Sequence, residues 1–385
     1  YMLDEMCSIV FTVGGQPSDG TVTVGAGETL RVSVKITLND AARKYLDDNF
    51  VNGMFVEGFV TLTDTAESEG INLSIPWLGF YGDWHAAPMF DLSTYDIADA
   101  MQDDSIPDEQ KPQESVFATV PLGSYYNGQY IIPLGTYLYT IPESMNKEMY
   151  ADKDKIAISM YDAVNHRTVF ELYAVYAGLL RGAKTMDVRI TDAVTGEVLY
   201  EEVKVNVRKS FSGGSTTASA SLIELEINPA ELGLANNRQY YFEMVGQMEA
   251  VLDGELPAVR PEDSFSFPFY IDNEAPEIVD YRVRFDAYKD NNETKYRVYL
   301  DVDVYDNQYA QSLGLCYLNT EENALELLTG DMLPIESTKG GITTVSVDIT
   351  DYYYSDTDIY LQVDDYALNT RSYRLSDYKT LAESV

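Results

Sequence analysis

The chain has 385 residues and carries 26 Lys and Arg against 63 Asp and Glu, which gives a formal net charge of −37. This charge excludes a general nucleic-acid binder, which needs Lys and Arg against the phosphates. Apolar residues make up 45% of the chain and include 31 Tyr and 14 Phe, too much core-forming material for a disordered acidic segment. No apolar stretch reaches the ~20 residues of a membrane-spanning helix, so we expect no membrane insertion.

Apolar and polar residues alternate along most of the chain, and this period of two predicts β-strands. In residues 30–38, five aliphatic side chains alternate with Arg, Ser, Lys and Thr. Such a strand would have one dry face and one wet face. Residues 39–50 follow as a predicted helix, with Asn39 or Asp40 as its N-cap.

The middle and the end of the chain are also dominated by strand signals. Residues 186–190 and 203–207 alternate on either side of a turn-forming segment at 192–196, which predicts a β-hairpin. After residue 50 we expect one more short helix, over residues 321–328. Further strands are predicted at residues 265–269, 296–304 and 359–363.

Turn formers and charged residues interrupt the strand pattern at two places, near residues 146–155 and at 271–278. In the second, Pro276 favours an extended backbone at Ala275 and cannot donate to a sheet. Residues 210–221, rich in Ser, Gly, Thr and Ala, are expected to form a mobile loop within one unit. These joints predict an all-β protein of three tandem immunoglobulin-like or fibronectin-III-like β-sandwich modules, at 1–151, 152–271 and 272–385.

The most distinctive stretch of the sequence lies in the first module and is rich in aromatic residues. It runs through residues 56–62 (VEGFVTL), 73–84 (LSIPWLGFYGDW) and 87–91 (APMFD). This order of segments resembles the fibronectin-type-III-like domain that follows the catalytic domain in bacterial cell-envelope subtilisin-like serine peptidases, the family of the lactocepins and the complement-cleaving surface peptidases. The later modules resemble further fibronectin-like modules of the same proteins, through residues 152–158, 191–196 and 269–276.

A peptidase resemblance requires a separate test for catalytic residues. A subtilisin-like enzyme uses Asp, His and Ser in that chain order, with the Ser in a Gly-Thr-Ser turn. This chain has no Gly-Thr-Ser, and its only two histidines, His85 and His166, lie in segments that favour structural or surface roles. We therefore expect no catalytic residues here, and the resemblance implies that those of a parent peptidase lie outside these residues.

The aromatic segment allows two interpretations. Trp77, Tyr81 and Trp84 are candidate binding residues if they form an exposed surface for a peptide, a glycan or the neighbouring catalytic domain. The alternative is that these rings pack over one another in the core of the module, because Gly79 and Gly82 allow the backbone to bend sharply there. The exposure of the rings decides between the two.

Calcium is the cofactor with some support in the sequence, because this hard cation takes clustered carboxylate, amide and carbonyl oxygens from loops. Asp272 lies at the second joint, and further acidic loops follow the strands of the third module. We take Asp306, Asp364 and Asp365 as candidate calcium ligands. No stretch has the pattern of an EF-hand loop, so a solvated acidic rim without bound metal remains the alternative.

Together these patterns predict a non-catalytic accessory region of a secreted or cell-wall-attached subtilisin-like serine endopeptidase. Its expected partners are the peptidase's own catalytic domain and protein or peptide substrates, and its roles would be those of a spacer, a scaffold and an exosite. The alternative is a surface adhesin or carbohydrate-binding protein without a peptidase domain, which rests on the abundant Tyr and on Trp77 and Trp84. An enzyme in its own right is the least supported interpretation, because no nucleophile and base can be named.

Overall fold

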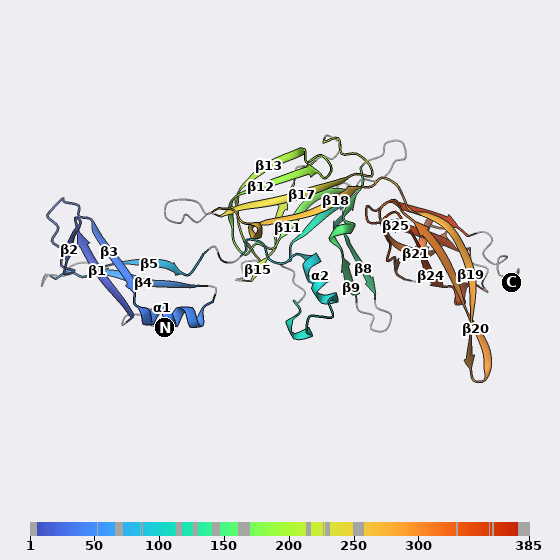
Figure 1. Cartoon of the computed structure of the whole chain (residues 1–385), viewed down its shortest axis with the longest axis horizontal. Helices are drawn as coiled ribbons and strands as arrows, with labels where there is room; N and C mark the ends of the chain where they lie inside the picture. Colours follow the sequence, from blue (N-terminus) through green and yellow to red (C-terminus); the bar gives the residue numbers. More distant parts are fainter. Residues whose placement is uncertain are drawn as a thin grey trace. The chain divides into compact units, whose positions relative to one another are not determined.

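The computed structural model divides into two compact units, Tyr1–Pro88 and Met89–Val385, which we call the N-terminal and C-terminal units and describe separately. The structure describes residues 6–51, 53–65, 72–84, 86, 88–112, 118–125, 130–140, 147–160, 170–212, 217–225, 227, 232–248, 258–328, 330–353, 355 and 358–375. Most of these residues lie in strands of several sheets, with a few short helices between them (Figure 1). This confirms the all-β class, while the division into three tandem modules stays a prediction.

The N-terminal unit contains a three-stranded antiparallel sheet of order β2–β1–β3 and a separate antiparallel pair, β4 and β5. The predicted helix after residue 38 is confirmed: Asn39 is its N-cap, and its side chain accepts a hydrogen bond from the backbone N–H of Ala42 at 2.9 Å. The helix buries Ala42 and Leu46. The elements are β1 Cys7–Val13, β2 Gln16–Ser18, β3 Val32–Leu38, α1 Asp40–Asn49, β4 Met54–Leu62 and β5 Leu73–Tyr81.

The C-terminal unit begins with two sheets, of order β10–β18–β17–β12–β13 and β16–β11–β6–β7, which we call the central sheets. Strand β17 buries every second side chain, among them Phe242, and Phe170 of β11 is also buried. The elements are β6 Val120–Tyr125, β7 Tyr130–Pro133, β10 Ala157–Ile158, β11 Phe170–Ala177, β12 Ala183–Asp192, β13 Val198–Val207, β16 Ser221–Glu224, β17 Gln239–Met248 and β18 Ser264–Ile271.

Short elements complete this part of the unit. The predicted hairpin is confirmed, because β12 and β13 pair antiparallel. The ends of the expected loop at 210–221 form a small ladder, and its residues 213–216 lie outside the described residues. The remaining elements are α2 Thr94–Gln102, η2 Asp108–Gln110, β8 Thr136–Thr140 paired with β9 Lys147–Ala151, η3 Lys153–Lys155, β14 Ser210–Phe211 paired with β15 Ala218–Ser219, and η4 Pro261–Asp263.

Residues on both sides of the expected module boundary at 151 share one sheet. Strand β6 pairs antiparallel with β11, so that Val120 lies opposite Tyr176. Helix α2 also belongs to this unit: its Tyr95 is buried and donates a hydrogen bond to the carbonyl oxygen of Leu134 at 2.7 Å. The segment from Met89 to Ala151 is therefore structurally continuous with the central sheets.

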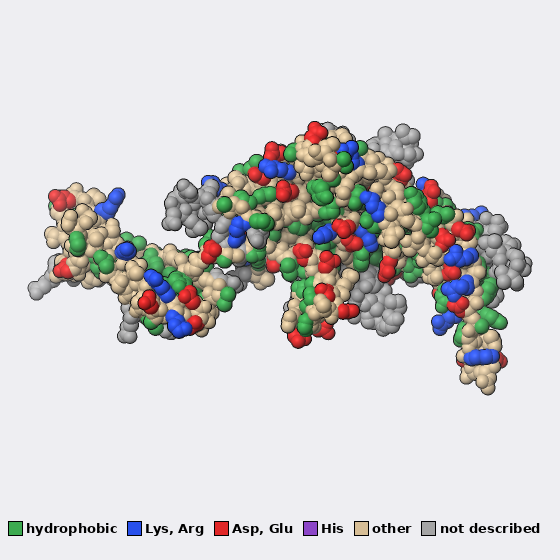
Figure 2. All heavy atoms as spheres, in the orientation of Figure 1, with side chains coloured by type: hydrophobic (Ala, Val, Ile, Leu, Met, Phe, Trp, Pro, Cys, Tyr) green, Lys and Arg blue, Asp and Glu red, His purple; other side chains and the backbone are tan. Residues whose placement is uncertain are grey.

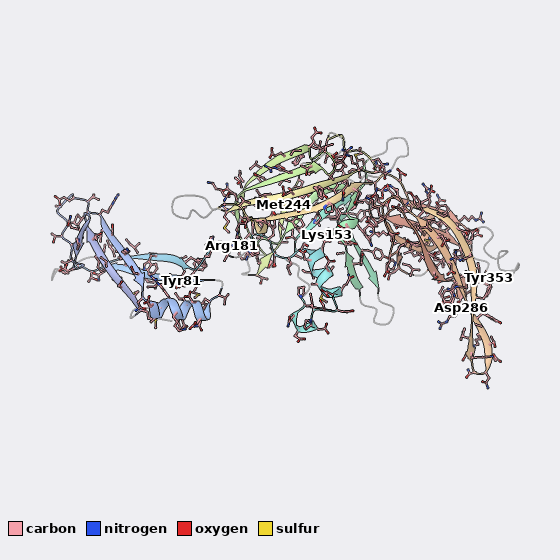
Figure 3. All side chains as sticks on the ribbon, viewed as in Figure 1. Tyr81, Lys153, Arg181, Met244, Asp286 and Tyr353 are labelled. Atoms are coloured by element: carbon pink, nitrogen blue, oxygen red, sulfur yellow. The ribbon has the colours of Figure 1, made fainter. Side chains whose placement is uncertain are left out.

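The remaining strands form two more sheets, of order β19–β20–β24 and β22–β21–β25–β26, with β23 paired to β21; we call them the C-terminal sheets. They enclose a core that includes Val298, Leu300, Leu315 and Leu361, all fully buried. Tyr353, labelled in Figure 3, is the last residue of α3, and its ring centroid lies 5.4 Å from that of Phe285 on β19. The elements are β19 Glu277–Asp290, β20 Glu293–Tyr305, β21 Ala310–Asn319, β22 Ala324–Leu327, β23 Leu333–Pro334, β24 Ile342–Asp348, α3 Thr350–Tyr353, β25 Tyr360–Asp365 and β26 Thr370–Arg374.

The helix predicted over residues 321–328 is wrong. Residues Ala324–Leu327 form strand β22, which pairs antiparallel with β21 after a tight turn in which Asn323 has a φ of 50°. The Asn319 side chain holds this turn, because its Oδ1 accepts the backbone N–H groups of Glu321 and Glu322. Pairing with a neighbouring strand here outweighs the helix propensity of the Glu and Leu residues.

Charged side chains are interspersed on the visible face of the molecule (Figure 2). On the ribbon of β19 and β20, Arg284 lies between Asp286 and Asp301, so that opposite charges neutralise one another locally. Within the described residues, no helix is long and apolar enough to cross a membrane.

Candidate metal centre

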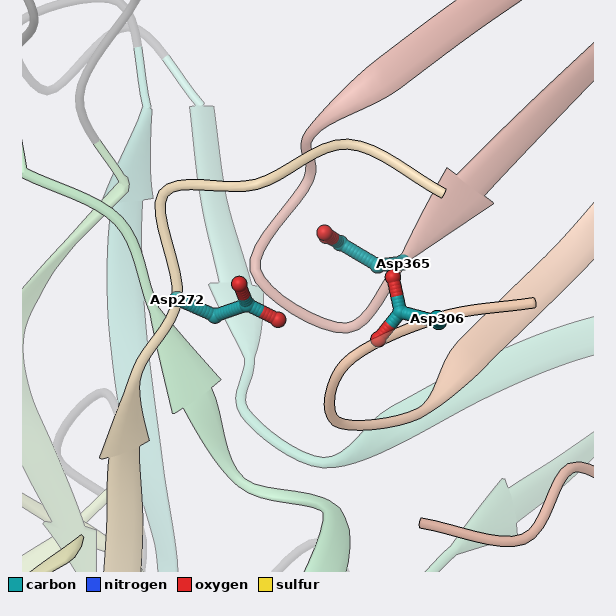
Figure 4. A group of neighbouring side chains, drawn as sticks. All are labelled: Asp272, Asp306 and Asp365. Carbon is teal, nitrogen blue, oxygen red and sulfur yellow. The ribbon is translucent and has the colours of Figure 1, made fainter. Parts of the chain in front are cut away.

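Three aspartates converge at strand ends in the C-terminal unit. Asp272 directly follows β18, Asp306 directly follows β20, and Asp365 is the last residue of β25. Each offers one carboxylate oxygen, and these three oxygens all lie within 4.8 Å of one another. All three side chains, drawn in Figure 4, belong to buried residues, with 1%, 3% and 0% of their surface exposed. We call Asp272, Asp306 and Asp365 the aspartate cluster.

Local turns orient these carboxylates. Every member of the aspartate cluster uses its Oδ1 to accept the backbone N–H of the residue two positions later in the chain, which is the geometry of an Asx turn. These bonds keep each carboxyl group close to its own loop and limit its rotation. The donors are Glu274 N for Asp272 at 3.1 Å, Gln308 N for Asp306 at 2.7 Å and Ala367 N for Asp365 at 2.8 Å.

Amide side chains surround the aspartate cluster. Asn307 Nδ2 donates to Asp272 Oδ1 at 2.9 Å, and Asn369 Nδ2 donates to Asp365 Oδ2 at 2.7 Å. Among the described residues, no Lys or Arg forms an ion pair with Asp306 or Asp365. These two charges therefore meet amide and backbone dipoles but no basic side chain.

Two buried oxygens in this region accept no hydrogen bond from the described residues. One is Oδ2 of Asp306 and the other is Oε1 of Gln308, a residue that is only 4% exposed. The Gln308 amide nitrogen is already used, since it donates to Asn237 Oδ1 at 3.3 Å. A buried polar atom without a partner costs free energy, so both oxygens are available to a ligand.

The proximity of the carboxyl groups changes their protonation. Burial, and next the charge of Asp272, raise the pKa of Asp306 to about 7. Burial and the charges of Asp272 and Asp306 likewise raise the pKa of Asp365 well above its ordinary value. Ionisation of all three groups together is therefore unfavourable unless a cation compensates the charge.

A cavity of about 310 Å³ adjoins the aspartate cluster on the side of Asp306. Its wall carries further acidic groups, and Arg371, its basic residue, is paired with Glu277 at 2.8 Å. The cavity thus offers an acidic approach to the buried carboxylates. It is lined by Asn273, Glu274, Ala275, Glu277, Tyr305, Asp306, Asn307 and Arg371.

The structure brings two of the three candidate calcium ligands together. Asp306 and Asp365 belong to the aspartate cluster, and their partner is Asp272, the aspartate of the second joint. Asp364 does not belong to the aspartate cluster, because successive side chains of β25 point to opposite faces of the sheet. Its carboxylate instead accepts a hydrogen bond from Gln362 Nε2 at 3.3 Å.

A buried lysine lies close to the same joint. Lys155 is 7% exposed, and its Nζ donates to the hydroxyl oxygen of Tyr150 at 2.9 Å. The Nζ atom also lies 5.8 Å from the ring centre of Tyr309 and 5.6 Å from that of Tyr366, at distances typical of cation–π contacts. Lys155 therefore connects the central sheets to residues of the C-terminal sheets.

The candidate binding residues of the N-terminal unit are half-buried and make contacts within the chain. The ring of Trp84 lies 4.8 Å from that of Phe80, in an edge-to-face arrangement. Tyr81 donates its hydroxyl hydrogen to Asp47 Oδ1 at 2.9 Å, and Trp77 packs over Gly58 on the paired strand. The two histidines, His85 and His166, lie outside the described residues.

Comparison with known proteins gives one family match. An Fn3-like domain model matches residues 12–78. The match begins in β1 and ends in β5, so it includes Trp77 and stops before Tyr81 and Trp84. No curated protein matches the chain. An Fn3-like region is thus present in the N-terminal unit.

Proposed function

We propose that this chain is the non-catalytic accessory region of a secreted or cell-wall-attached subtilisin-like serine endopeptidase. The observation that carries the proposal is the Fn3-like match at residues 12–78. It covers VEGFVTL at 56–62 and the first half of LSIPWLGFYGDW at 73–84, the stretch that resembles the domain following the catalytic domain in these peptidases. In this proposal the region is a spacer and a scaffold for the catalytic domain.

The contacts inside the C-terminal unit support the role of a spacer. Separate modules move relative to one another unless a sizeable apolar contact joins them. Here Ala157 and Tyr270 of the central sheets form one buried cluster with Tyr366 and Ala367, which follow β25. Lys155 and the hydrogen bond from Asn307 to Asp272 add polar contacts across the same joint. Such a joint would hold the modules in a fixed orientation.

The charge supports a second role, as an exosite for protein substrates. A net charge of −37 favours basic partners and accelerates their encounter at low ionic strength. Carboxylates outnumber basic side chains by more than two to one, so the net field of the chain attracts a basic loop of a substrate.

The coding sequence on both sides of this chain provides the first test. The proposal expects Asp, His and Gly-Thr-Ser in subtilisin order before Tyr1. In that full-length peptidase, deletion of residues 89–385 should reduce kcat/KM for a folded basic protein and leave kcat/KM for a short peptide nearly unchanged. Finding only further sandwich modules upstream would favour the adhesin instead, and equal loss on both substrates would contradict the exosite.

A further inference from the structure

We propose that Asp272, Asp306 and Asp365 bind one calcium ion, which ties the central sheets to the C-terminal sheets. The three ligands come from three different sheets, because β18, β20 and β25 each belong to a separate one. An ion held by all three would cross-link them at a single point. This inference concerns the chain itself and holds whether or not a peptidase domain precedes it.

The chemistry of the donors selects the ion. All three ligands are carboxylate oxygens, and the aspartate cluster contains no His or Cys, so zinc and other softer metals are disfavoured. Calcium binds oxygens at about 2.3–2.6 Å, so two oxygens on opposite sides of the ion are up to about 5 Å apart. The three oxygens of the aspartate cluster lie within 4.8 Å of one another, so one calcium ion can contact all of them. Magnesium requires shorter distances and a more regular octahedron.

The second, independent observation is the pair of unused oxygens. Asp306 Oδ2 and Gln308 Oε1 are buried and accept no hydrogen bond from any described residue. Calcium takes both carboxylate and amide oxygens, so an ion in the aspartate cluster would satisfy Asp306 Oδ2. Gln308, whose backbone N–H donates a hydrogen bond to Asp306 Oδ1, carries the second unused oxygen on the same loop. Figure 4 shows the carboxyl groups of Asp272 and Asp306 directed toward each other across the space that Asp365 borders. Water from the adjoining cavity could complete the six to eight ligands that calcium requires.

The charge balance points in the same direction. Three ionised carboxylates carry a charge of −3, and the described residues pair neither Asp306 nor Asp365 with a basic group. Without a cation, these groups must either take up protons or repel one another in a buried site. A divalent cation removes most of this repulsion, so calcium should favour the folded C-terminal unit over its unfolded state.

The test uses the full chain of 385 residues after treatment with a chelator and removal of that chelator. Calcium is titrated by isothermal titration calorimetry at physiological salt, and melting is followed by scanning calorimetry. We expect one saturable site per chain, and at a hundredfold excess over Kd a rise in the melting temperature of the C-terminal unit by about 5 °C or more. Asp306→Asn should weaken calcium binding by about 10- to 100-fold or more.

Glu293→Gln is the matched control, because it also removes one negative charge from the C-terminal unit but lies exposed on β20. Glu293→Gln should bind calcium with the affinity of the wild type and show the same rise in melting temperature. Any weak, non-specific binding of calcium to the acidic surface is the same in this variant as in Asp306→Asn. Asp272→Asn serves as a second variant if Asp306→Asn does not fold. Circular dichroism of each variant without calcium establishes whether it is folded.

The melting temperatures of the wild type and Asp306→Asn, compared with and without calcium, distinguish a calcium site from an ordinary network of protonated aspartates. Without calcium at pH 8, Asp306→Asn should melt at or above the temperature of the wild type, because it removes one of the repelling charges. With saturating calcium the order should reverse. If calcium binds Glu293→Gln and Asp306→Asn equally, or leaves the melting temperature of the wild type unchanged, the proposal is overturned.

Discussion

A single carboxylate holds together the end of the hairpin formed by β12 and β13. Asp192 is 6% exposed, and its Oδ1 accepts the backbone N–H groups of Val194 and Thr195 at 2.8 and 2.9 Å. Its Oδ2 lies 2.5 Å from the guanidinium of Arg238. The Arg238 guanidinium, together with the backbone donors, holds the pKa of Asp192 well below its ordinary value despite the opposing effect of burial.

We predict that Asp192→Asn lowers the melting temperature of the C-terminal unit at neutral pH. Because the pKa of Asp192 is depressed in the folded state, its stabilising contribution is present above the ordinary carboxyl pKa of about 4 and is lost as the pH falls toward the folded value. The difference between wild type and variant should therefore shrink between about pH 5 and pH 2. Thermal melts across this range, followed by circular dichroism, measure it.

Asp187→Asn is the control for this prediction. Asp187 lies on the same strand, but 41% of its side-chain surface is exposed and its distance to Arg189 is 3.9 Å. Exposed ion pairs of this kind contribute little to stability. An equal loss of melting temperature in both variants, or a difference that stays constant with pH, would show that Asp192 does not act through its ionised carboxylate.

At the level of whole elements, side chains of β17 alternate between a buried and an exposed face, so neighbouring residues should contribute very differently to stability. Phe242 is fully buried and stacks on Phe267 of β18 with the ring centroids 4.8 Å apart. Tyr241, the preceding residue, points to the other face and is 46% exposed. We predict that Phe242→Ala lowers the free energy of unfolding by about 3–5 kcal/mol, because it removes buried apolar surface and leaves a cavity.

Tyr241→Ala should cost less than about 1 kcal/mol, since it removes a half-exposed ring without opening the core. Urea denaturation of the two variants measures both losses. The free energies can be compared directly if both variants unfold with the same dependence on urea concentration. Similar losses for both would mean that the register of β17 is shifted by one residue, because such a shift exchanges the buried and exposed faces.

The sequence predicts elements well where local signals and tertiary packing agree. The alternation at residues 296–304 corresponds to β20, and Asn39 caps α1 as expected. Helix α2 was missed, although Ser93 and Asp96 form a reciprocal capping box with the spacing that marks a helix start. The strand β22 could not be predicted from local propensity, because its partner β21 supplies the ladder that decides its conformation.

The aspartate cluster was predictable only in part, for a similar reason. Acidic residues near strand ends suggested loops with calcium chemistry, and the structure places Asp306 directly after β20 and Asp365 at the end of β25. The pairing of strands in space decides which loops meet, and the alternation of β25 decides that Asp365 rather than Asp364 points inward. Neither of these can be read from spacing along the chain.

At the scale of the whole molecule, the contacts predict how the chain unfolds. The N-terminal unit ends at Pro88 and the C-terminal unit begins at Met89. In the C-terminal unit, central and C-terminal sheets share the apolar cluster around Tyr366 and the contacts of Lys155. We therefore predict two calorimetric transitions for the full chain: one for the N-terminal unit, and one in which the central and C-terminal sheets unfold together.

Lys155→Met tests whether this joint couples the sheets. Methionine has a similar length to lysine but carries no charge, so the variant loses the cation near the rings of Tyr309 and Tyr366. A cation–π interaction at a desolvated site is worth about 1–2 kcal/mol. We expect the second transition to broaden or to split into two. Lys153→Met is the control, because Lys153, labelled in Figure 3, is exposed and should leave the transition unchanged. Three separate transitions in the wild type would instead mean that the sheets fold as independent modules and that the joint does not couple them.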